Sequence, residues 1–330
     1  MSAATRWLLS AGLLIFVGVL ASQGLSTVLS TLAVAGFGLV LVALYHLLPL
    51  VLDAAAIRVL FASSASGTLR DAILARWVGE SANSLMPAGQ IGGPVLMARH
   101  LAVRGLPMPD AVAAAIVSTT LQTFAQIGFA LVGVGLLGAH ASHASQDAVR
   151  TSSLVASGFL GLQIVGFYFA QRRGIFGKLM RAAARFTGKR DWSEWMSHAE
   201  AIDVAVERTY RRAGPAALSF ALSSIGWLVG TVEVYWILDL IGSRVGWTDA
   251  LLLESVGQAI RGAAFAVPGA LGVQEGGYVL LASLVGLPSH AGLALSLGKR
   301  AREILLGLPG LIYLHLSERA GASAVRAAPR

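Results

Sequence analysis

Long apolar windows alternate with short polar stretches along most of the chain. Six windows are long enough to cross a bilayer, because a spanning helix needs roughly 20 mostly apolar residues. They cover residues 7–25, 32–52, 111–137, 154–170, 216–241 and 291–316. The first window follows Arg6 as a secretory signal would, but its apolar stretch is long for such a signal, and we interpret it as a membrane anchor.

Two further segments, about residues 70–106 and 249–287, are apolar but interrupted in the middle by proline and glycine. The interruptions centre on Pro87 and Pro268. Proline lacks the N–H that a helix interior needs and glycine weakens a helix, so each segment predicts two half-helices joined by a loop. We expect both segments to be re-entrant hairpins rather than plain spans.

The two broken segments share a spacing that indicates an internal repeat. In each, the proline is followed 20 residues later by a second proline, Pro107 or Pro288, which a Gly-Leu pair precedes. Three predicted spans separate the segments, so the second would enter the membrane from the opposite face. Such an inverted repeat brings two broken hairpins together near the midplane, where they form a polar site that lipid cannot reach.

The positions of lysine and arginine orient the chain. With a cytoplasmic amino terminus and two re-entrant segments, 19 of the 25 basic residues lie on the cytoplasmic side, and Arg150 and Arg244 lie outside. Both termini are then cytoplasmic. The cytoplasmic stretch 171–214 predicts an amphipathic helix, a collar that lies at the headgroup level or packs against the ends of the spans.

Composition agrees with a bilayer environment. Hydrophobic residues make up 55% of the chain and charged residues 13%, against about a quarter charged in soluble domains. We therefore expect an all-α polytopic membrane protein, with residues 1–330 forming one integral membrane domain of about six spans. The net charge of +8 reflects basic cytoplasmic loops rather than a nucleic-acid partner. The chain has no cysteine and no recognisable catalytic motif, so we expect no enzyme activity, catalytic residue, metal or cofactor.

Ionisable residues at membrane depth are the informative ones, because a charge there is costly without a partner or a purpose. Arg261 and Arg300 suit a lipid phosphate, since a guanidinium can bind two oxygens at once. In the alternative interpretation the acidic and basic groups only pair with one another. Four cations face three carboxylates, a surplus of one positive charge: Arg261, Lys299, Arg300, Arg302, Glu80, Glu275 and Glu303. We expect no role for four other residues: Asp53, Glu233, Asp239 and Glu254.

Residues 79–87 followed by Gly92 and Gly93, together with residues 268–276, resemble the two signature segments of the lysylphosphatidylglycerol synthase transmembrane region family. The resemblance covers nearly the whole chain. It implies a lipid flippase of the bacterial inner membrane whose substrate path is formed by the two broken segments. Residues 44–50 and the length are most similar to the hopanoid-biosynthesis-associated branch. The family's synthases carry a soluble aminoacyl-transferase domain that this chain lacks, so lysine transfer to lipid is not implied.

The expected function is therefore a lipid translocase for a hopanoid, a phospholipid or a polyprenyl phosphate. Polar side chains would provide donors and acceptors for the headgroup, and glycines would let the backbone approach it. The expected substrate-binding residues are Glu80, Asn83, Pro87, Gln90, Gly92, Gly93, Arg261, Pro268, Gly269, Gly272, Gln274, Glu275 and Arg300.

Two other functions stay open from the sequence. One is a membrane enzyme that modifies a lipid headgroup, with Glu80 or Glu275 as general base. The other is a scaffold without transport activity that recruits lipid-biosynthesis enzymes through Trp192, Trp195 and the basic collar.

Overall fold

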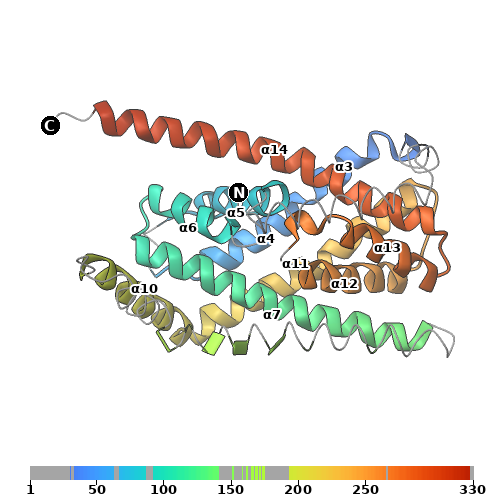
Figure 1. The fold of residues 1–330 in the computed structure, drawn as a ribbon, viewed down its shortest axis with the longest axis horizontal. Helices are drawn as coiled ribbons and strands as arrows, with labels where there is room; N and C mark the ends of the chain where they lie inside the picture. Colours follow the sequence, from blue (N-terminus) through green and yellow to red (C-terminus); the bar gives the residue numbers. More distant parts are fainter. Residues whose placement is uncertain are drawn as a thin grey trace.

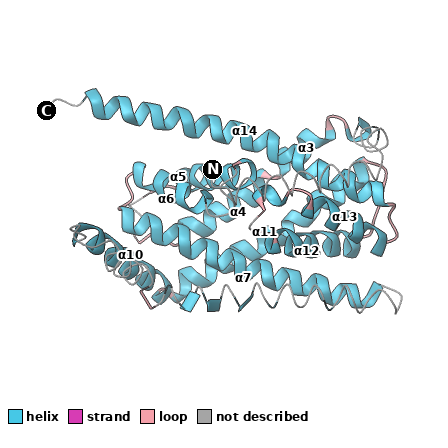
Figure 2. Cartoon of the chain, viewed as in Figure 1, coloured by secondary structure: helices cyan, strands magenta, loops and turns pink. Residues whose placement is uncertain are grey.

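The structure is a computed structural model that describes residues 30, 33–62, 67–86, 92–140, 151, 158, 161–162, 165–166, 168–169, 171, 173–174, 193–264 and 267–327. Within these ranges the regular structure is entirely helical (Figure 2). The predicted all-α class is therefore confirmed. The predicted anchor at 7–25 and most of the predicted span at 154–170 lie outside the described residues.

The described helices follow the predicted order along the chain. They are α3 (Gly38–Tyr45), α4 (Leu47–Arg58), α5 (Leu69–Leu85), α6 (Gly92–Val103), α7 (Met108–His140), α10 (Ser193–Arg211), α11 (Ala213–Leu240), α12 (Trp247–Ala263), the short 3₁₀ helix η3 (Pro268–Ala270), α13 (Val273–Leu284) and α14 (Ser289–Ala327).

Three helical stretches in the described part of the chain are long and apolar enough to cross a membrane: Gly38–Arg58, Met108–Leu137 and Ala213–Leu240. They correspond to three of the six predicted spans. Helix α14 extends well beyond the predicted 291–316 and carries four charged residues in its first half, at positions 299, 300, 302 and 303. The chain is a polytopic membrane protein, and the total of six spans stays a prediction.

Both predicted hairpins are helix–break–helix units. Helix α5 ends at Leu85 and α6 begins at Gly92. In the second unit the single turn η3 lies between α12 and α13. Gly269 and Gly272 have φ angles of 60° and 77°, a left-handed conformation that costs little only without a Cβ. The break in the second hairpin is therefore fixed by glycine backbone geometry.

The two units contact one another in a reciprocal pattern, which agrees with the predicted inverted repeat. In the first unit α5 packs on α6 and α6 on α7, and in the second α12 packs on α13 and α13 on α14. Helix α5 also packs on α14, and α12 on α7. Figure 1 shows the hairpins toward opposite ends of the molecule, with α7 and α14 running in opposite directions.

The apolar residues divide into two buried clusters and an outer surface. One cluster includes Ala75, Leu101 and Val117, and the other includes Ile237, Leu253 and Leu295. Large apolar side chains are also exposed on the outside of the spans, among them Leu41, Leu44, Leu131, Val132, Ile225, Leu228, Leu308 and Ile312. An apolar exterior of this kind suits helices that face lipid.

The predicted collar forms helix α10, which lies beside one end of α7 (Figure 1). Its apolar face is buried through Ala199, Ala205 and Val206. Arg208 of α10 also pairs with Asp110 in the first turn of α7. The collar helix thus packs against the end of a predicted span, and its position at the headgroup level stays a prediction. Trp192 and the side chain of Trp195 lie outside the described residues.

Candidate functional site

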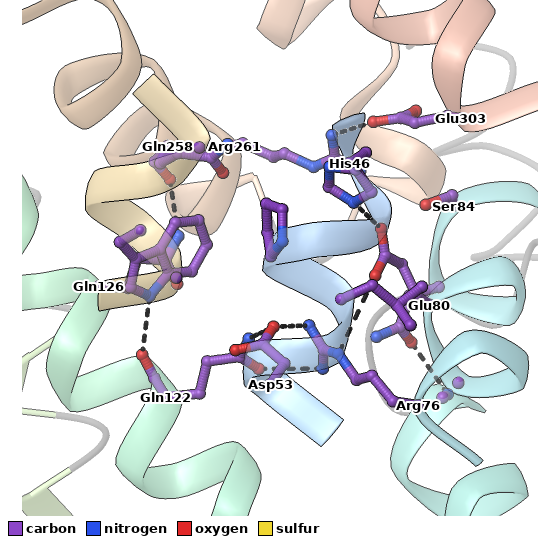
Figure 3. A pocket seen from close by; sticks show the side chains of 18 of the residues that line it. His46, Asp53, Arg76, Glu80, Ser84, Gln122, Gln126, Gln258, Arg261 and Glu303 are labelled. Carbon is purple, nitrogen blue, oxygen red and sulfur yellow. Dashed lines mark hydrogen bonds and ion pairs between the residues drawn. The ribbon is translucent and has the colours of Figure 1, made fainter. Parts of the chain in front are cut away.

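A cavity of about 210 Å³ lies between the two hairpins. Its walls come from α4, α5, α6, α7, α11, α12, η3, α14 and the junction between α3 and α4. Figure 3 shows charged and amide side chains from both halves of the chain pointing into this space.

One end of the cavity is a hydrogen-bonded triangle that connects α4, α5 and α7 (Figure 3). Arg76 donates to Asp53 Oδ2 from Nη2 at 2.7 Å and to Gln122 Oε1 from Nη1 at 3.0 Å. Gln122 in turn donates from Nε2 to Asp53 Oδ2 at 2.5 Å. Glu80 Oε2 lies 3.9 Å from Arg76 Nε, four residues further along α5.

His46 occupies the junction of α3 and α4. Three residues later Pro49 contributes no N–H to the helix, which accounts for the interruption there. The imidazole Nε2 lies 2.7 Å from Glu80 Oε1, and Nδ1 contacts Glu233 Oε1 on α11. Arg302 of α14 lies over the same ring, with Nη1 2.7 Å from Nε2. His46 therefore connects the first hairpin to α11 and α14.

The second half contributes a further set of ion pairs. Arg261 of α12 pairs with Glu303 of α14 and also donates to Gln274 Oε1 at 3.1 Å. Lys299 pairs with Glu254, and both side chains are almost fully buried. Beside them, amides of α7 and α12 form a polar wall, in which Gln126 donates to the backbone oxygen of Gln258 at 2.9 Å (Figure 3).

The expectation of one surplus positive charge among the side chains at membrane depth is wrong. Among the described residues the ion-pair network contains five Lys or Arg side chains and six carboxylates: Arg76, Arg261, Lys299, Arg300, Arg302, Asp53, Glu80, Glu233, Glu254, Glu275 and Glu303. The expectation failed because the fold brings Asp53, Glu233 and Glu254 into the network from three helices. With a neutral His46 the network carries one negative charge, and with a protonated His46 it is neutral.

The structure divides the predicted binding residues into two groups. Five of them line the cavity: Glu80, Asn83, Gly93, Arg261 and Gly269. Five others lie outside its lining: Gly92, Gly272, Gln274, Glu275 and Arg300. Pro87 and Gln90 are outside the described residues, and Pro268 is described only as the first residue of η3.

Glu275 and Arg300 form the centre of a contact that fastens α13 to α14. Glu275 is fully buried and accepts hydrogen bonds from the Gly272 N–H at 2.7 Å and from Arg300 Nε at 2.9 Å. Gln274 donates to Ser296 Oγ at 3.1 Å in the same seam. These side chains hold the second hairpin in place.

Several lining residues were not predicted from the sequence, and helical spacing could have found some of them. Gln122 and Gln126 are four residues apart on α7, so they project from one face of an otherwise apolar span. On α12, Glu254, Gln258 and Arg261 follow the same periodicity. The remaining unpredicted polar residues include His46, Asp53, Arg76, Glu233, Lys299 and Arg302.

The fold and the site define a class: an all-α, polytopic membrane protein with a cavity lined by charged and amide side chains between two broken hairpins. The family profile described as lysylphosphatidylglycerol synthase TM region matches residues 5–310. The chain therefore belongs to this family, which indicates a lipid-related function in a membrane. No curated protein and no solved structure matches the chain. Assignment to the hopanoid-associated branch stays a prediction.

Proposed function

We propose that the protein is a lipid translocase in which the headgroup passes through the cavity while the hydrophobic tail stays in lipid. The observation that carries this proposal is a charged, hydrogen-bonding cavity lined by helices whose outer surface is apolar. Passage of the polar headgroup is the costly step in moving a lipid between leaflets, because polar groups lose their hydration in hydrocarbon. A polar cavity between broken helices lowers that cost.

The charge of the cavity suits a headgroup that is not strongly anionic. Its lining is nearly balanced, with four Lys or Arg side chains and five carboxylates. Arg76 and Arg302 line the cavity, and we propose that their guanidinium groups donate to headgroup oxygens. Phospholipid phosphates and the hydroxyls of an extended hopanoid both supply such acceptors, and we favour these over a polyprenyl phosphate.

This function requires no catalysis, and we propose that the protein is not an enzyme. The proposed location is the inner membrane of a bacterium, with both termini in the cytoplasm. An enzyme that modifies headgroups would release a lipid of altered mass. A scaffold for lipid-biosynthesis enzymes would leave lipid distribution unchanged. Both alternatives are distinguished by an assay on the purified protein.

The test uses vesicles that contain the purified protein and a trace of short-chain, tail-labelled phosphatidylglycerol. Serum albumin extracts the probe from the outer leaflet, so the extractable fraction reports movement between leaflets. We expect the wild-type protein to make the whole probe extractable, with its mass unchanged. A second set of vesicles carries a hopanoid with a polyhydroxylated side chain as competitor, and slower movement of the probe there would identify a shared site.

Arg261→Gln and Arg300→Gln form a matched pair of variants. Each removes one partly buried guanidinium that contacts Glu303, but of the two only Arg261 lines the cavity. A hydrogen bond to a charged group contributes about 1.5–3 kcal/mol, so we expect Arg261→Gln to slow movement about ten- to a hundredfold, and Arg300→Gln to act mainly on stability. Wild-type rates in folded Arg261→Gln, or no movement with the wild-type protein, would contradict the proposal.

A further inference from the structure

His46 is held between carboxylates from two different parts of the fold. Its side chain is 13% exposed, and each ring nitrogen faces one acidic group: Glu80 of the first hairpin and Glu233 of α11. The Arg302 guanidinium approaches the same ring, with Nη1 2.5 Å from Nδ1 and 2.7 Å from Nε2. Three charged side chains thus compete for one imidazole.

These partners cannot all be satisfied in one protonation state. A neutral imidazole has one N–H and one lone pair, so it can donate to one carboxylate and accept from Arg302. An imidazolium has two N–H groups and no free lone pair, so it can donate to Glu80 and Glu233 together. Arg302 then depends on its carboxylate partners, Glu233 at 3.5 Å and Glu303 at 3.7 Å. Gain or loss of one proton therefore changes which groups are held together.

Glu80 has a second cationic partner in reach. Its Oε2 lies 3.9 Å from Arg76 Nε, which has no hydrogen-bond partner among the described residues. When His46 is neutral and donates to Glu233, Glu80 can pair with Arg76 instead. Because Glu80 belongs to α5 and Glu233 to α11, the protonation of His46 determines whether the first hairpin is connected to α11 through the imidazole.

The charged side chains around His46 favour the binding of one proton to its imidazole. The charged groups of the helices around the ring line the same cavity: Asp53, Arg76, Glu80, Glu233, Glu254, Arg261, Lys299, Arg302 and Glu303. The complete ion-pair network, which adds Arg300 and Glu275, has one carboxylate more than it has Lys and Arg side chains. A proton on His46 makes the network neutral, so proton binding and the charge of a headgroup in the cavity are linked.

We propose that His46 is the proton-binding site of a proton-coupled lipid translocase, in which each lipid crosses together with, or in exchange for, one proton. This inference rests on the proposed function and adds its energy source. The structure supplies the two elements that coupling needs: a titratable group inside the headgroup cavity and a hairpin contact that depends on its proton.

The test measures the final distribution of the lipid rather than its rate of movement. Vesicles with the purified protein and tail-labelled phosphatidylglycerol are given a gradient of about one pH unit, which can sustain at most about a tenfold concentration ratio per coupled proton. We expect the wild-type protein to enrich the probe several-fold in one leaflet, and the enriched leaflet to switch when the gradient is reversed.

The decisive variant is His46→Gln, in which an amide replaces the titratable imidazole. We expect it to leave the probe equally divided between leaflets under the same gradient. The matched control is His100→Gln on α6, a buried histidine outside the cavity lining whose nearest hydrogen-bond partner is Tyr313. This control should retain the enrichment. If His46→Gln does not fold, Glu80→Gln, which removes one of the two carboxylates, should also reduce the enrichment.

The outcomes separate the two proposals. A wild-type protein that moves the probe but leaves it equally divided under the gradient would overturn the proton site and keep the translocase. Enrichment by His46→Gln at the wild-type level would overturn the role of His46. A wild-type protein that moves no probe would contradict the translocase, and the proton-coupled mechanism would fail with it.

Discussion

The two broken hairpins follow the same plan but are closed by different forces. In the first hairpin, Asn83 Oδ1 accepts the Gly93 N–H at 2.9 Å, and α5 approaches α6 closely at Gly79. In the second, the fully buried Glu275 caps the N-terminus of α13 and pairs with Arg300 of α14. A neutral hydrogen bond thus closes one hairpin, whereas an ion pair fastens the other to the neighbouring helix.

This difference sets what each hairpin presents to the cavity. Glu80 and Arg261 each lie seven residues before the central proline of their segment, and both line the cavity with opposite charges. In the second hairpin Glu275, the acidic residue nearest the break, closes the hairpin, and Arg261 faces the cavity. In the first hairpin no charged residue is needed for closure, and Glu80 faces the cavity. An inverted repeat can therefore preserve its backbone plan while the two halves acquire complementary chemistry.

The largest effect on stability should follow from neutralising the buried carboxylate of the second hairpin. Glu275→Gln leaves the Arg300 guanidinium with only Glu303, 3.4 Å from Nη1. Breaking a buried ion pair costs about 3–5 kcal/mol, and we expect the lower end of that range because one partner remains. Thermal unfolding of the purified protein in detergent measures the change.

The comparison variant is Glu80→Gln in the first hairpin. The Glu80 side chain is 26% exposed, so we expect this variant to lose less stability than Glu275→Gln. The double variant Glu275→Gln with Arg300→Gln removes both charges and should recover part of the loss. Equal destabilisation by Glu275→Gln and Glu80→Gln would show that the two hairpins are fastened alike.

A smaller effect should come from adding a methyl group where the first hairpin closes. In Gly93→Ala the new Cβ would lie 2.5 Å from the backbone oxygen of Gly79 and collide with Asn83 Oδ1. Backbone atoms cannot move aside as a side chain does, so we expect a loss of about 1–3 kcal/mol. The matched change in the second hairpin is Gly277→Ala, whose Cβ would meet only the Ile260 side chain, at 3.0 Å.

For Gly277→Ala we expect a loss of about 0.5 kcal/mol, because Ile260 can shift. Unfolding curves of the two variants, recorded under the same conditions, provide the comparison. A greater loss in Gly277→Ala than in Gly93→Ala would mean that close helix approach matters more in the second hairpin than in the first.

Local sequence signals were enough to predict the hairpins. Proline and glycine end a helix by their own backbone properties, so the breaks at Pro87 and Pro268 could be predicted without knowledge of any partner. The reciprocal packing of the two units agrees with the repeat that the proline spacing indicated. The amphipathic pattern within residues 171–214 likewise predicted a helix, and packing against the ends of the spans was one of two alternatives, but the pattern did not indicate α7 as the partner of α10.

The charge network could be predicted only in part, because it depends on which helices become neighbours. Glu275 and Arg300 were candidates for binding a headgroup, and a charge on an apolar helix fits that role and a structural role equally well. Their mutual contact across 25 residues supports a fastening role, and their role in binding a headgroup stays a prediction. His46 and Glu233 are 187 residues apart, and nothing in their local sequences indicates that they meet.

The smallest predicted effect concerns the start of each hairpin. Helix α5 begins with a capping box in which Thr68 and Asp71 satisfy each other's backbone N–H groups. Helix α12 begins after Gly246, which offers no side-chain cap, although Asp249 occupies the matching position three residues later. Gly246 has φ −71° and ψ 162°, a conformation that serine adopts without strain, and a Cβ there would have no contact closer than 3.6 Å.

Gly246→Ser should therefore give the second hairpin the cap that the first already has. Serine exceeds glycine at this position by only a few tenths of a kcal/mol, so we expect a gain of about 0.3 kcal/mol, seen as a slightly higher unfolding temperature. Gly246→Ala is the control, since it reduces backbone freedom in the same way but carries no hydroxyl. If both variants are stabilised equally, the gain comes from the reduced backbone freedom and not from the hydroxyl. The missing cap of α12 would then not make the second hairpin less stable than the first.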